Sequence, residues 1–304
     1  MKNILVTGGA GFIGATLVPM LIEQNYSVHI LDDLSVGTKE THAGLDVQWH
    51  VGDIRDDEFV NHAMAGMDGV VHLAAHTNVI DSQTKPRHDF EVNVGGTLNL
   101  LLAAREQGVS RFVMASSNAP IGENEPPIDE SKPARPLSPY GASKLAGEGY
   151  CSAFHGSYGL GTVVLRFANV YGPRSTHKGS VVAKFIKDAM NDGALTIYGD
   201  GLQTRDFVHV ADLSRAIIAG LKSDCGGETF QVATGLETNI LELAEMIQTA
   251  LPERSIQIVH EGQRAGEIIK NYSSIEKARR MLGWEPQILL ADGLAETVDF
   301  FVSK

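Results

Sequence analysis

Short apolar runs rich in Val, Ile and Leu alternate with amphipathic segments along the first half of the chain. Such branched, nearly continuous apolar runs are typical of parallel strands buried on both faces. The predicted strands are Asn3–Val6, Val28–Leu31, Val47–Val51, Gly69–Leu73, Arg111–Met114 and Thr162–Leu165. Helical periodicity lies between them at Ala15–Gln24, Asp56–Met64 and Phe90–Gln107. Repeated β-α-β units predict an α/β fold with a doubly wound parallel sheet and right-handed crossovers.

Beyond about residue 170 the pattern is less regular and mixes helices with short strands. Helices are predicted at Val181–Asn191, Val210–Leu221, Ile240–Leu251, Ser274–Met281 and Leu290–Phe301, and strands at Leu195–Tyr198, Thr229–Val232 and Ile256–Val259. This mixture predicts a smaller C-terminal α+β lobe, so that 1–170 and 171–304 form two lobes. Because no Ser/Gly-rich linker separates them, the lobes are expected to pack as one body.

One proline-rich segment, Asn118–Pro139, has no apolar period. It is expected to be a long surface loop. Connections of this length and type often belong to an active site.

Composition and charge narrow the class of protein. The chain has 304 residues, of which 43% are hydrophobic, and a formal net charge of −12. Because phosphate backbones and anionic membranes are bound by clustered Lys and Arg, this charge argues against a nucleic-acid or membrane partner. The two cysteines, Cys151 and Cys225, fit no zinc spacing and suggest a reducing compartment. No signal peptide or membrane span is predicted, so a cytoplasmic protein is expected.

Eleven histidines raise the question of a metal site. His72 and His76 are four residues apart, but they straddle the end of a predicted strand. Ligands at this spacing need a shared helix face, and no carboxylate is correctly spaced beside them. No metal site is predicted.

A glycine-rich turn, TGGAGFIG, follows the first strand and precedes the first helix. Gly9, Gly11 and Gly14 fit G-x-G-x-x-G, and Gly8 with the last two fits G-x-x-G-x-x-G. The missing side chains let the backbone approach a pyrophosphate at the positive end of the helix dipole, as in Rossmann dinucleotide-binding folds. The alternative is a tight structural turn.

Acidic residues at the ends of the next two strands favour NAD as the cofactor. Asp32 can accept hydrogen bonds from the adenosine ribose hydroxyls and would repel the 2′-phosphate of NADP. Asp33 could share or assume this role. After the third strand, Asp53 and Ile54 can meet the adenine, although an aspartate in this place is as often a helix cap.

A tyrosine and a lysine lie four residues apart in the stretch SPYGASK at 138–144. Ser138 and Pro139 suit the cap and the first turn of a helix, which puts Tyr140 and Lys144 on one face. A free tyrosine has a pKa of ~10, and a nearby ammonium together with an oxidised nicotinamide lowers it. The pair then becomes an acid/base for oxidation of a hydroxyl group, although an ordinary helical pair has the same spacing.

A third catalytic group, a hydroxyl that holds the substrate oxygen, is expected near the end of the fifth strand. Ser116 and Ser117 directly follow Arg111–Ala115. Because a hydroxyl stands where the third group is expected, the catalytic interpretation of Tyr140 and Lys144 is favoured over that of an ordinary helical pair.

Motifs along nearly the whole chain resemble those of one family. They are TGGAGFIG, HLAA at 72–75, SS at 116–117, SPYGASK, LRFANVYGPR at 165–174, LTIYGDGLQTRDFVHVAD at 195–212 and RAGEIIKNYSSIEKARRMLGWEP at 264–286. Together they resemble extended short-chain dehydrogenase/reductases, and more narrowly the NAD-dependent epimerase/dehydratase family, with UDP-hexose 4-epimerases nearest.

The resemblance implies roles for individual residues. It makes Ser117 the catalytic hydroxyl, Tyr140 the base, and Lys144 the group that holds the nicotinamide ribose and tunes Tyr140. It implies a cofactor site formed by Gly8, Gly11, Phe12, Ile13, Gly14, Asp32, Asp33, Asp53, Ile54, Ala74, Ala75, Tyr140 and Lys144. On the substrate side it implies that Ser117, Asn169, Arg205, Arg264 and Glu267 contact a UDP-sugar, with both arginines on the diphosphate. The homodimer is the expected assembly.

The chain also departs from the family pattern. Pro120-Ile121-Gly122 stands where V-Y-G is usual, and Phe207 replaces a frequent tyrosine. Asn118-Ala119 stands where sugar 4,6-dehydratases carry Asp-Glu, so the acid that expels water is missing. Asn271 falls where some hexose epimerases carry a tyrosine.

The implied reaction is inversion of C4 of a UDP-sugar through a transient 4-keto intermediate, with NAD held throughout. The alternatives are an NDP-sugar dehydratase, a dehydrogenase or keto-sugar reductase, and a non-catalytic NAD-binding sensor. The extra room beside Asn271 predicts that N-acetylated or uronate UDP-sugars are accepted alongside, or instead of, UDP-glucose, unless Asn271 is solvent-exposed and the loop of Pro120 and Ile121 sets the size.

Overall fold

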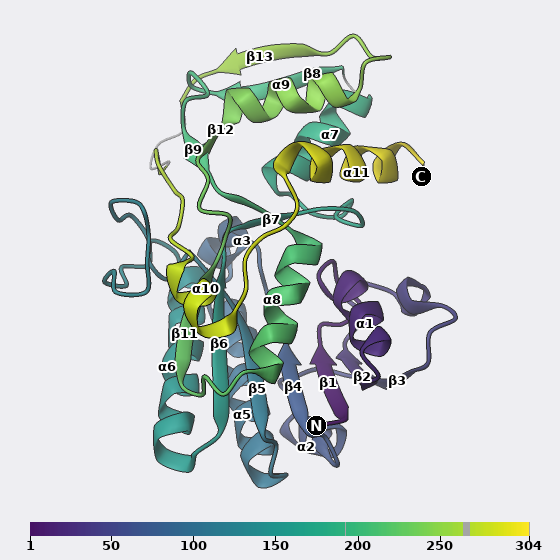
Figure 1. Cartoon of the computed structure of the whole chain (residues 1–304), viewed down its shortest axis with the longest axis vertical. Coiled ribbons are helices and arrows are strands. Elements are labelled where there is room, and N and C mark those ends of the chain that lie inside the picture. The colour runs from purple at the N-terminus through teal and green to yellow at the C-terminus, as the bar shows by residue number, and fades with distance from the viewer. Residues whose placement is uncertain (192, 264–267, 304) are drawn as a thin grey trace.

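The structure is a computed structural model that describes residues 1–191, 193–263 and 268–303. Seven parallel strands form the main sheet in the order β11-β6-β5-β4-β1-β2-β3 (Figure 1). Their bounds are β1 Asn3–Thr7, β2 Ser27–Asp32, β3 Val47–Val51, β4 Gly69–His72, β5 Arg111–Ser117, β6 Gly161–Phe167 and β11 Glu228–Val232. The predicted doubly wound Rossmann sheet is confirmed.

Two layers of helices cover the sheet because each strand sends successive side chains to opposite faces. On β1, Ile4 and Val6 join one core with α1 (Gly14–Glu23) and α8 (Val210–Lys222). Leu5 joins the other core. That second core is covered by α2 (Asp57–Met64), α5 (Gly96–Glu106) and α6 (Pro139–Tyr158).

The predicted helix Phe90–Gln107 is divided into three parts. α4 (Pro86–Phe90) passes into one turn of π-helix, η2 (Glu91–Gly95), before α5 begins. A further helix, α3 (Val79–Thr84), was not predicted. Its apolar residues Val79 and Ile80 are exposed, so it has no buried apolar stripe for a pattern to reveal.

The smaller lobe lies beyond the carboxyl ends of the strands, at the top of Figure 1. Its own core is built from α7, α9 and α11 packed on a parallel pair of strands, β8 and β13. The bounds are α7 Val181–Asn191, β8 Ala194–Tyr198, α9 Ile240–Ala250, β13 Gln257–Glu261 and α11 Leu290–Val302. Two further short pairs join β7 (Asn169–Tyr171) to β10 (Phe207–His209) and β9 (Thr204–Arg205) to β12 (Thr238–Asn239).

The chain after residue 170 contributes to both lobes. α8 and β11 return to the main sheet, and α10 (Glu276–Leu282) packs on β11. Pattern alone cannot say which sheet a short strand joins, because that depends on contacts distant in sequence. The assignment of 1–170 to NAD and of 171–304 mainly to the nucleotide-sugar therefore stays a prediction. Within the described residues, no helix is long and apolar enough to cross a membrane.

Candidate active site

The three predicted catalytic side chains come together where β5 ends and α6 begins. Ser117 is the last residue of β5, and α6 packs against that strand. The Ser138 hydroxyl accepts a hydrogen bond from the Gly141 amide at 3.1 Å, which confirms the predicted helix cap. Tyr140 and Lys144 therefore lie one turn apart, and both are buried.

Burial dominates the electrostatics of the pair. It raises the pKa of Tyr140 to about 12, an effect that a hydrogen bond with Ser117 opposes and the charge of Asp89 increases. Burial also lowers the pKa of Lys144 to about 8, against the charges of Asp89 and Glu148. The lowering of the Tyr140 pKa by Lys144 together with an oxidised nicotinamide stays a prediction. The Lys144 ammonium donates to the Ala115 carbonyl at 3.0 Å.

The glycine turn fits a dinucleotide because side chains would fill it. Gly8 has φ +68°, and a Cβ there would lie 2.6 Å from the Ala74 nitrogen. A Cβ on Gly14 would lie 2.2 Å from the Gly9 carbonyl oxygen. Gly11 is open apart from the Gly8 carbonyl, as close approach of a pyrophosphate to a helix N-terminus requires. Next to it, Phe12 is buried and Ile13 is half-buried.

The acidic residue that ends β2 accepts a hydrogen bond from the glycine turn. The Asp32 carboxylate accepts from the Ala10 amide and from the Leu34 amide, both at 2.9 Å. Asp33 is exposed and accepts from the Ser35 amide. The ribose roles of Asp32 and Asp33 stay predictions.

A buried histidine that sequence reasoning missed supports the same turn. His42, in the short helix η1 (Lys39–His42), lies 2.8 Å from the Gly9 carbonyl through Nε2. Because a carbonyl only accepts, this nitrogen must carry the proton. No sequence signal marks the contact, since the two residues are 33 positions apart.

The two residues after β3 have different surroundings. Asp53 is not the cap of α2, because Asp56 fills that position by accepting from the Phe59 amide at 3.0 Å. Asp53 instead pairs with the guanidinium of Arg55. Ile54 is buried and packs against Gly96 of α5. Contact of either residue with adenine stays a prediction.

The histidine of HLAA belongs to a buried chain of hydrogen bonds. The Ala74 amide donates to the Thr7 hydroxyl at 3.3 Å, and that hydroxyl meets His72 Nδ1 at 2.8 Å. His72 Nε2 meets the Thr97 hydroxyl at 2.9 Å, which in turn donates to the Asn93 carbonyl. Burial lowers the pKa of His72 to about 3, so the ring is neutral. The chain fixes Ala74 beside Gly8 of the glycine turn, and contact of Ala74 and Ala75 with the cofactor stays a prediction.

Of the two histidines considered as metal ligands, His72 is held in this hydrogen-bond chain, and His76 lies beside the carboxylates of Asp81 and Asp89. In the part of the chain that the structure describes, no group of three or more His, Cys, Asp or Glu residues could hold a metal ion.

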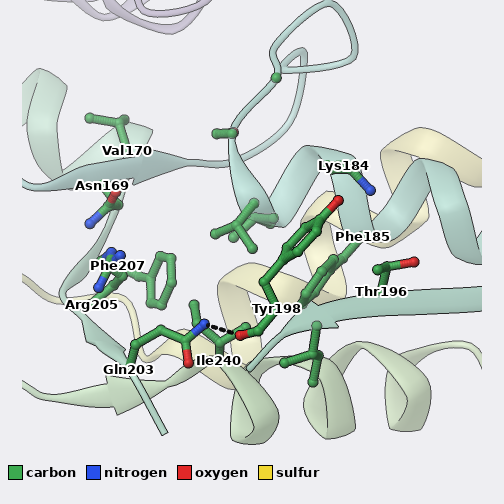
Figure 2. A pocket seen from close by; sticks show the side chains of 15 residues that line it. Asn169, Val170, Lys184, Phe185, Thr196, Tyr198, Gln203, Arg205, Phe207 and Ile240 are labelled. Carbon is green, nitrogen blue, oxygen red and sulfur yellow. Dashed lines mark hydrogen bonds between the residues drawn. The ribbon is translucent and has the colours of Figure 1, made fainter. Parts of the chain in front are cut away.

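A cavity of about 240 Å³ lies among the short strands β7, β8, β9 and β10 and the helix α7 (Figure 2). Asn169 and Arg205 both line it, and their predicted contact with the substrate stays a prediction. Phe207, which stands where the family often has a tyrosine, lines it as well, together with two aromatic residues that sequence reasoning missed, Phe185 and Tyr198. The predicted residues Arg264 and Glu267 lie outside the described residues.

Polar contacts hold the cavity wall in place. Arg205 Nη1 donates to the carbonyls of Thr204 and Ile268 at 2.7 and 2.8 Å. Asn169 Nδ2 donates to the Asp206 carbonyl at 3.1 Å. In Figure 2, Asn169, Arg205 and Phe207 lie on one side of the cavity, and the Tyr198 ring stands between them and Lys184.

Comparison with known proteins defines the class. The model of the NAD dependent epimerase/dehydratase family matches residues 4–233, and the chain belongs to this family. NAD is therefore its cofactor.

Individual relatives are more specific. The chain is 37% identical to the UDP-glucose 4-epimerase of Mycolicibacterium smegmatis, over 99% of this chain and 98% of the relative. It is similar to the crystal structure of the Thermotoga maritima UDP-glucose 4-epimerase with UDP-glucose, with a TM-score of 0.94, 36% identity and 99% coverage of both chains. The structure of the Thermus thermophilus UDP-glucose 4-epimerase in complex with NAD is similar as well, with a TM-score of 0.91 and 36% identity over 99% of each chain.

Proposed function

We propose that this chain is an NAD-dependent epimerase that inverts C4 of a UDP-sugar through a transient 4-keto intermediate. One observation carries the proposal: Ser117, Tyr140 and Lys144 converge at the carboxyl end of β5. Ligands of doubly wound sheets bind at this edge. The relatives named UDP-glucose 4-epimerase support the same activity.

The three catalytic groups divide the work of the reaction. Ser117 holds the C4 oxygen, and Tyr140 removes the hydroxyl proton and later returns it. Lys144 binds the nicotinamide ribose and favours the tyrosine's charged form. Bound NAD supplies a reversible hydride acceptor. Because the cycle has no net redox change, the protein needs to hold its cofactor rather than exchange it.

Dehydration, another reaction of this family, is less favoured for this chain than epimerisation. It needs an acid beside the catalytic hydroxyl to expel water from the sugar. At that position Asn118 Nδ2 donates to the Ser273 hydroxyl at 3.0 Å, and Ala119 follows. Neither side chain can give up a proton, so the 4-keto intermediate keeps its substituents and is reduced again.

The cavity of Figure 2 is the proposed site of the nucleotide. The Tyr198 ring offers a face on which a base can stack. Asn169 and Arg205 offer donors for phosphate and sugar oxygens. Arg264 and Glu267 complete this site in the proposal, by resemblance alone. Anchoring the nucleotide leaves the sugar free to turn in the pocket, which places binding energy away from the reacting centre.

Arg205→Ala is expected to weaken UDP-sugar binding while leaving NAD in place. Loss of one charge-assisted contact costs ~1.5–3 kcal/mol. KM should rise accordingly, whereas the NAD content of the purified protein should not change, because Arg205 lines the proposed nucleotide cavity and no residue of the glycine turn lines that cavity. Steady-state kinetics and a NAD assay measure both quantities. If the variant lost its NAD, the division into a cofactor lobe and a substrate lobe would be wrong.

The sugar itself is the finer part of the proposal. Asn271 is half-buried, whereas Ile121 is fully buried and its amide donates to the Asn118 carbonyl. A small amide in place of a tyrosine leaves room for a substituent larger than hydroxyl. We therefore include N-acetylated and uronate UDP-sugars among the substrates to be tested.

We further propose that two copies associate through the outer face of α6. A stripe of small side chains at helical spacing runs along it: Ala142, Ala146, Gly149, Ala153 and Gly156. All are exposed or half-buried. Small residues let a second helix approach closely, and two-fold dimers are the commonest assembly.

Gly149→Arg is expected to convert the dimer into monomers. A Cβ at Gly149 has no atom within 4 Å, so the fold of one copy tolerates the arginine while the facing copy does not. Sedimentation velocity measures the change. Gly262→Arg, at another position where a Cβ is unobstructed, is the matched control. A wild-type monomer, or a Gly149→Arg dimer, would contradict the proposal.

A cytoplasmic location is proposed as well. Cys151 and Cys225 are both free thiols. Free thiols persist in reducing compartments, which supports this location.

A further inference from the structure

A buried carboxylate lies behind the catalytic helix and has no place in the reaction described above. Asp89 belongs to α4, which packs against α6, and only 1% of it is exposed. Burial of a carboxylate is costly unless hydrogen bonds or charges compensate for it. Its partners therefore indicate what it does.

Hydrogen bonds connect Asp89 to the turn of α6 that carries Tyr140 and Lys144. Asn93 Nδ2 lies 3.0 Å from Asp89 Oδ1 and 3.2 Å from the Ser143 hydroxyl. The Ser143 hydroxyl donates to the Tyr140 carbonyl at 2.9 Å. Asn93 sits in the π-helical turn η2, so this irregular turn aims one amide at both groups.

A histidine covers the same carboxylate on its solvent side. His76 Nδ1 lies 3.4 Å from Asp89 Oδ1, and its backbone is held by both ends of the Asn93 amide. The other ring nitrogen, Nε2, lies 3.5 Å from the half-exposed carboxylate of Asp81. The ring of His88 contacts His76 edge-on at 5.1 Å between centroids.

The charge of Asp89 acts on both catalytic groups. It raises the pKa of Lys144 and adds to the raised pKa of Tyr140. The other carboxylate near Lys144, Glu148, is paired with Arg166 at 2.7 Å, and this ion pair offsets much of its charge. The titratable groups around the pair are His72 of β4, His76, Asp81, His88 and Asp89 of the β4–α4 segment, and Glu148 and Cys151 of α6.

We propose that Asp89 is a positioning residue of this epimerase, whose buried carboxylate keeps the Lys144 ammonium charged and sets the pH range in which Tyr140 takes the sugar's proton. The role in turnover rests on the proposed function. The effect on the charge of Lys144 does not.

Removing the charge of Asp89 should lower the pKa of both catalytic groups. Without Asp89, burial of Lys144 is less opposed, so the pKa of Lys144 falls. The phenolate of Tyr140 also loses a repelling neighbour, so the pKa of Tyr140 falls as well. Both limbs of a bell-shaped pH profile of kcat should therefore move toward lower pH.

The test compares variants of the purified, NAD-containing protein. Asp89→Asn keeps the shape of the side chain and an acceptor for Asn93. An NMR pH titration of the lysine ε-methylene signals, with Lys144 assigned through Lys144→Met, should show the Lys144 midpoint lower by about one pH unit. The pH profile of kcat should shift the same way. Asp89→Glu, which retains the charge, should restore both.

Asp81→Asn is the matched control, because it removes the same charge from the other side of His76. It should leave the Lys144 midpoint unchanged. If Asp89→Asn does not fold, as judged by circular dichroism, Asp89→Ser makes the same charge change with a smaller side chain.

An unchanged or raised Lys144 midpoint in the charge-removing variants, or an equal shift in Asp81→Asn, would overturn the proposal. Absence of turnover in the wild-type protein with every UDP-sugar would count against the proposed function instead. The NMR titration would still decide the role of Asp89.

Discussion

Tyr140→Phe is expected to lower kcat for epimerisation by roughly 10²–10⁴-fold, the usual contribution of a positioned acid/base. The ring of Tyr140 is buried at the start of α6, and phenylalanine preserves that packing. Thermal unfolding should therefore change little. Turnover of UDP-glucose, followed by a coupled assay for the C4 epimer, measures the loss.

Tyr150→Phe removes a hydroxyl from the same helix at an exposed position, and it should turn over like the wild type. Near-normal turnover of Tyr140→Phe would refute the assignment of Tyr140 as the base. A similar loss in both variants would point to damage to α6 rather than to the loss of a proton acceptor.

Gly8→Ala is expected to weaken NAD binding by at least about tenfold, equivalent to about 1.4 kcal/mol. Wild-type protein should carry NAD through purification, and assay of the supernatant after denaturation should detect it. Residue 8 has φ +68°, and its Cβ in the variant would lie 2.6 Å from the backbone nitrogen of Ala74. Both the strain and the clash distort the turn. Most of the bound NAD should then be lost.

Gly66→Ala separates the effect of backbone strain from the effect of the clash with Ala74. Gly66 has φ +75°, and a Cβ there has no atom within 4 Å, so the variant has the backbone strain without the clash. It should retain NAD. Equal loss in both variants would mean that general instability empties the site, and NADP in the wild-type supernatant would overturn the ribose assignment of Asp32.

Local chemistry explains why much of this site could be predicted from sequence. The glycine turn and the start of α6 are each specified within about ten residues, by backbone conformation and helix capping. Ser138 caps the helix as expected, and Tyr140 and Lys144 share a turn. Strands buried on both faces were equally visible because their apolar runs are continuous.

Contacts between distant segments explain what could not be predicted. His42 supports Gly9 from 33 residues away, and Asn118 meets Ser273 from 155 residues away. The π-helical turn η2 breaks a pattern that otherwise reads as one helix, and it is this turn that aims Asn93 at Asp89. No propensity encodes such a turn, since tertiary packing selects it.

The cavity of Figure 2 is a similar case. Asn169 and Arg205 were predicted through their motifs, whereas Phe185 and Tyr198 were not. The signal for Tyr198 is the aromatic residue before Gly199 in the same motif as Arg205. Phe185 has none, because its side chain reaches the cavity only through the packing of α7.

The central claim is C4 inversion by a cofactor that never leaves, and isotope tracing tests it most directly. Purified protein without added NAD would be incubated with UDP-glucose that carries deuterium at C4, and with its N-acetylhexosamine and uronate counterparts, and the products read by NMR. At least one sugar should give its C4 epimer with the deuterium still at C4, and the NAD content should not change. A 4-keto-6-deoxy product, accumulation of NADH, or an epimer that had lost its deuterium would contradict the account.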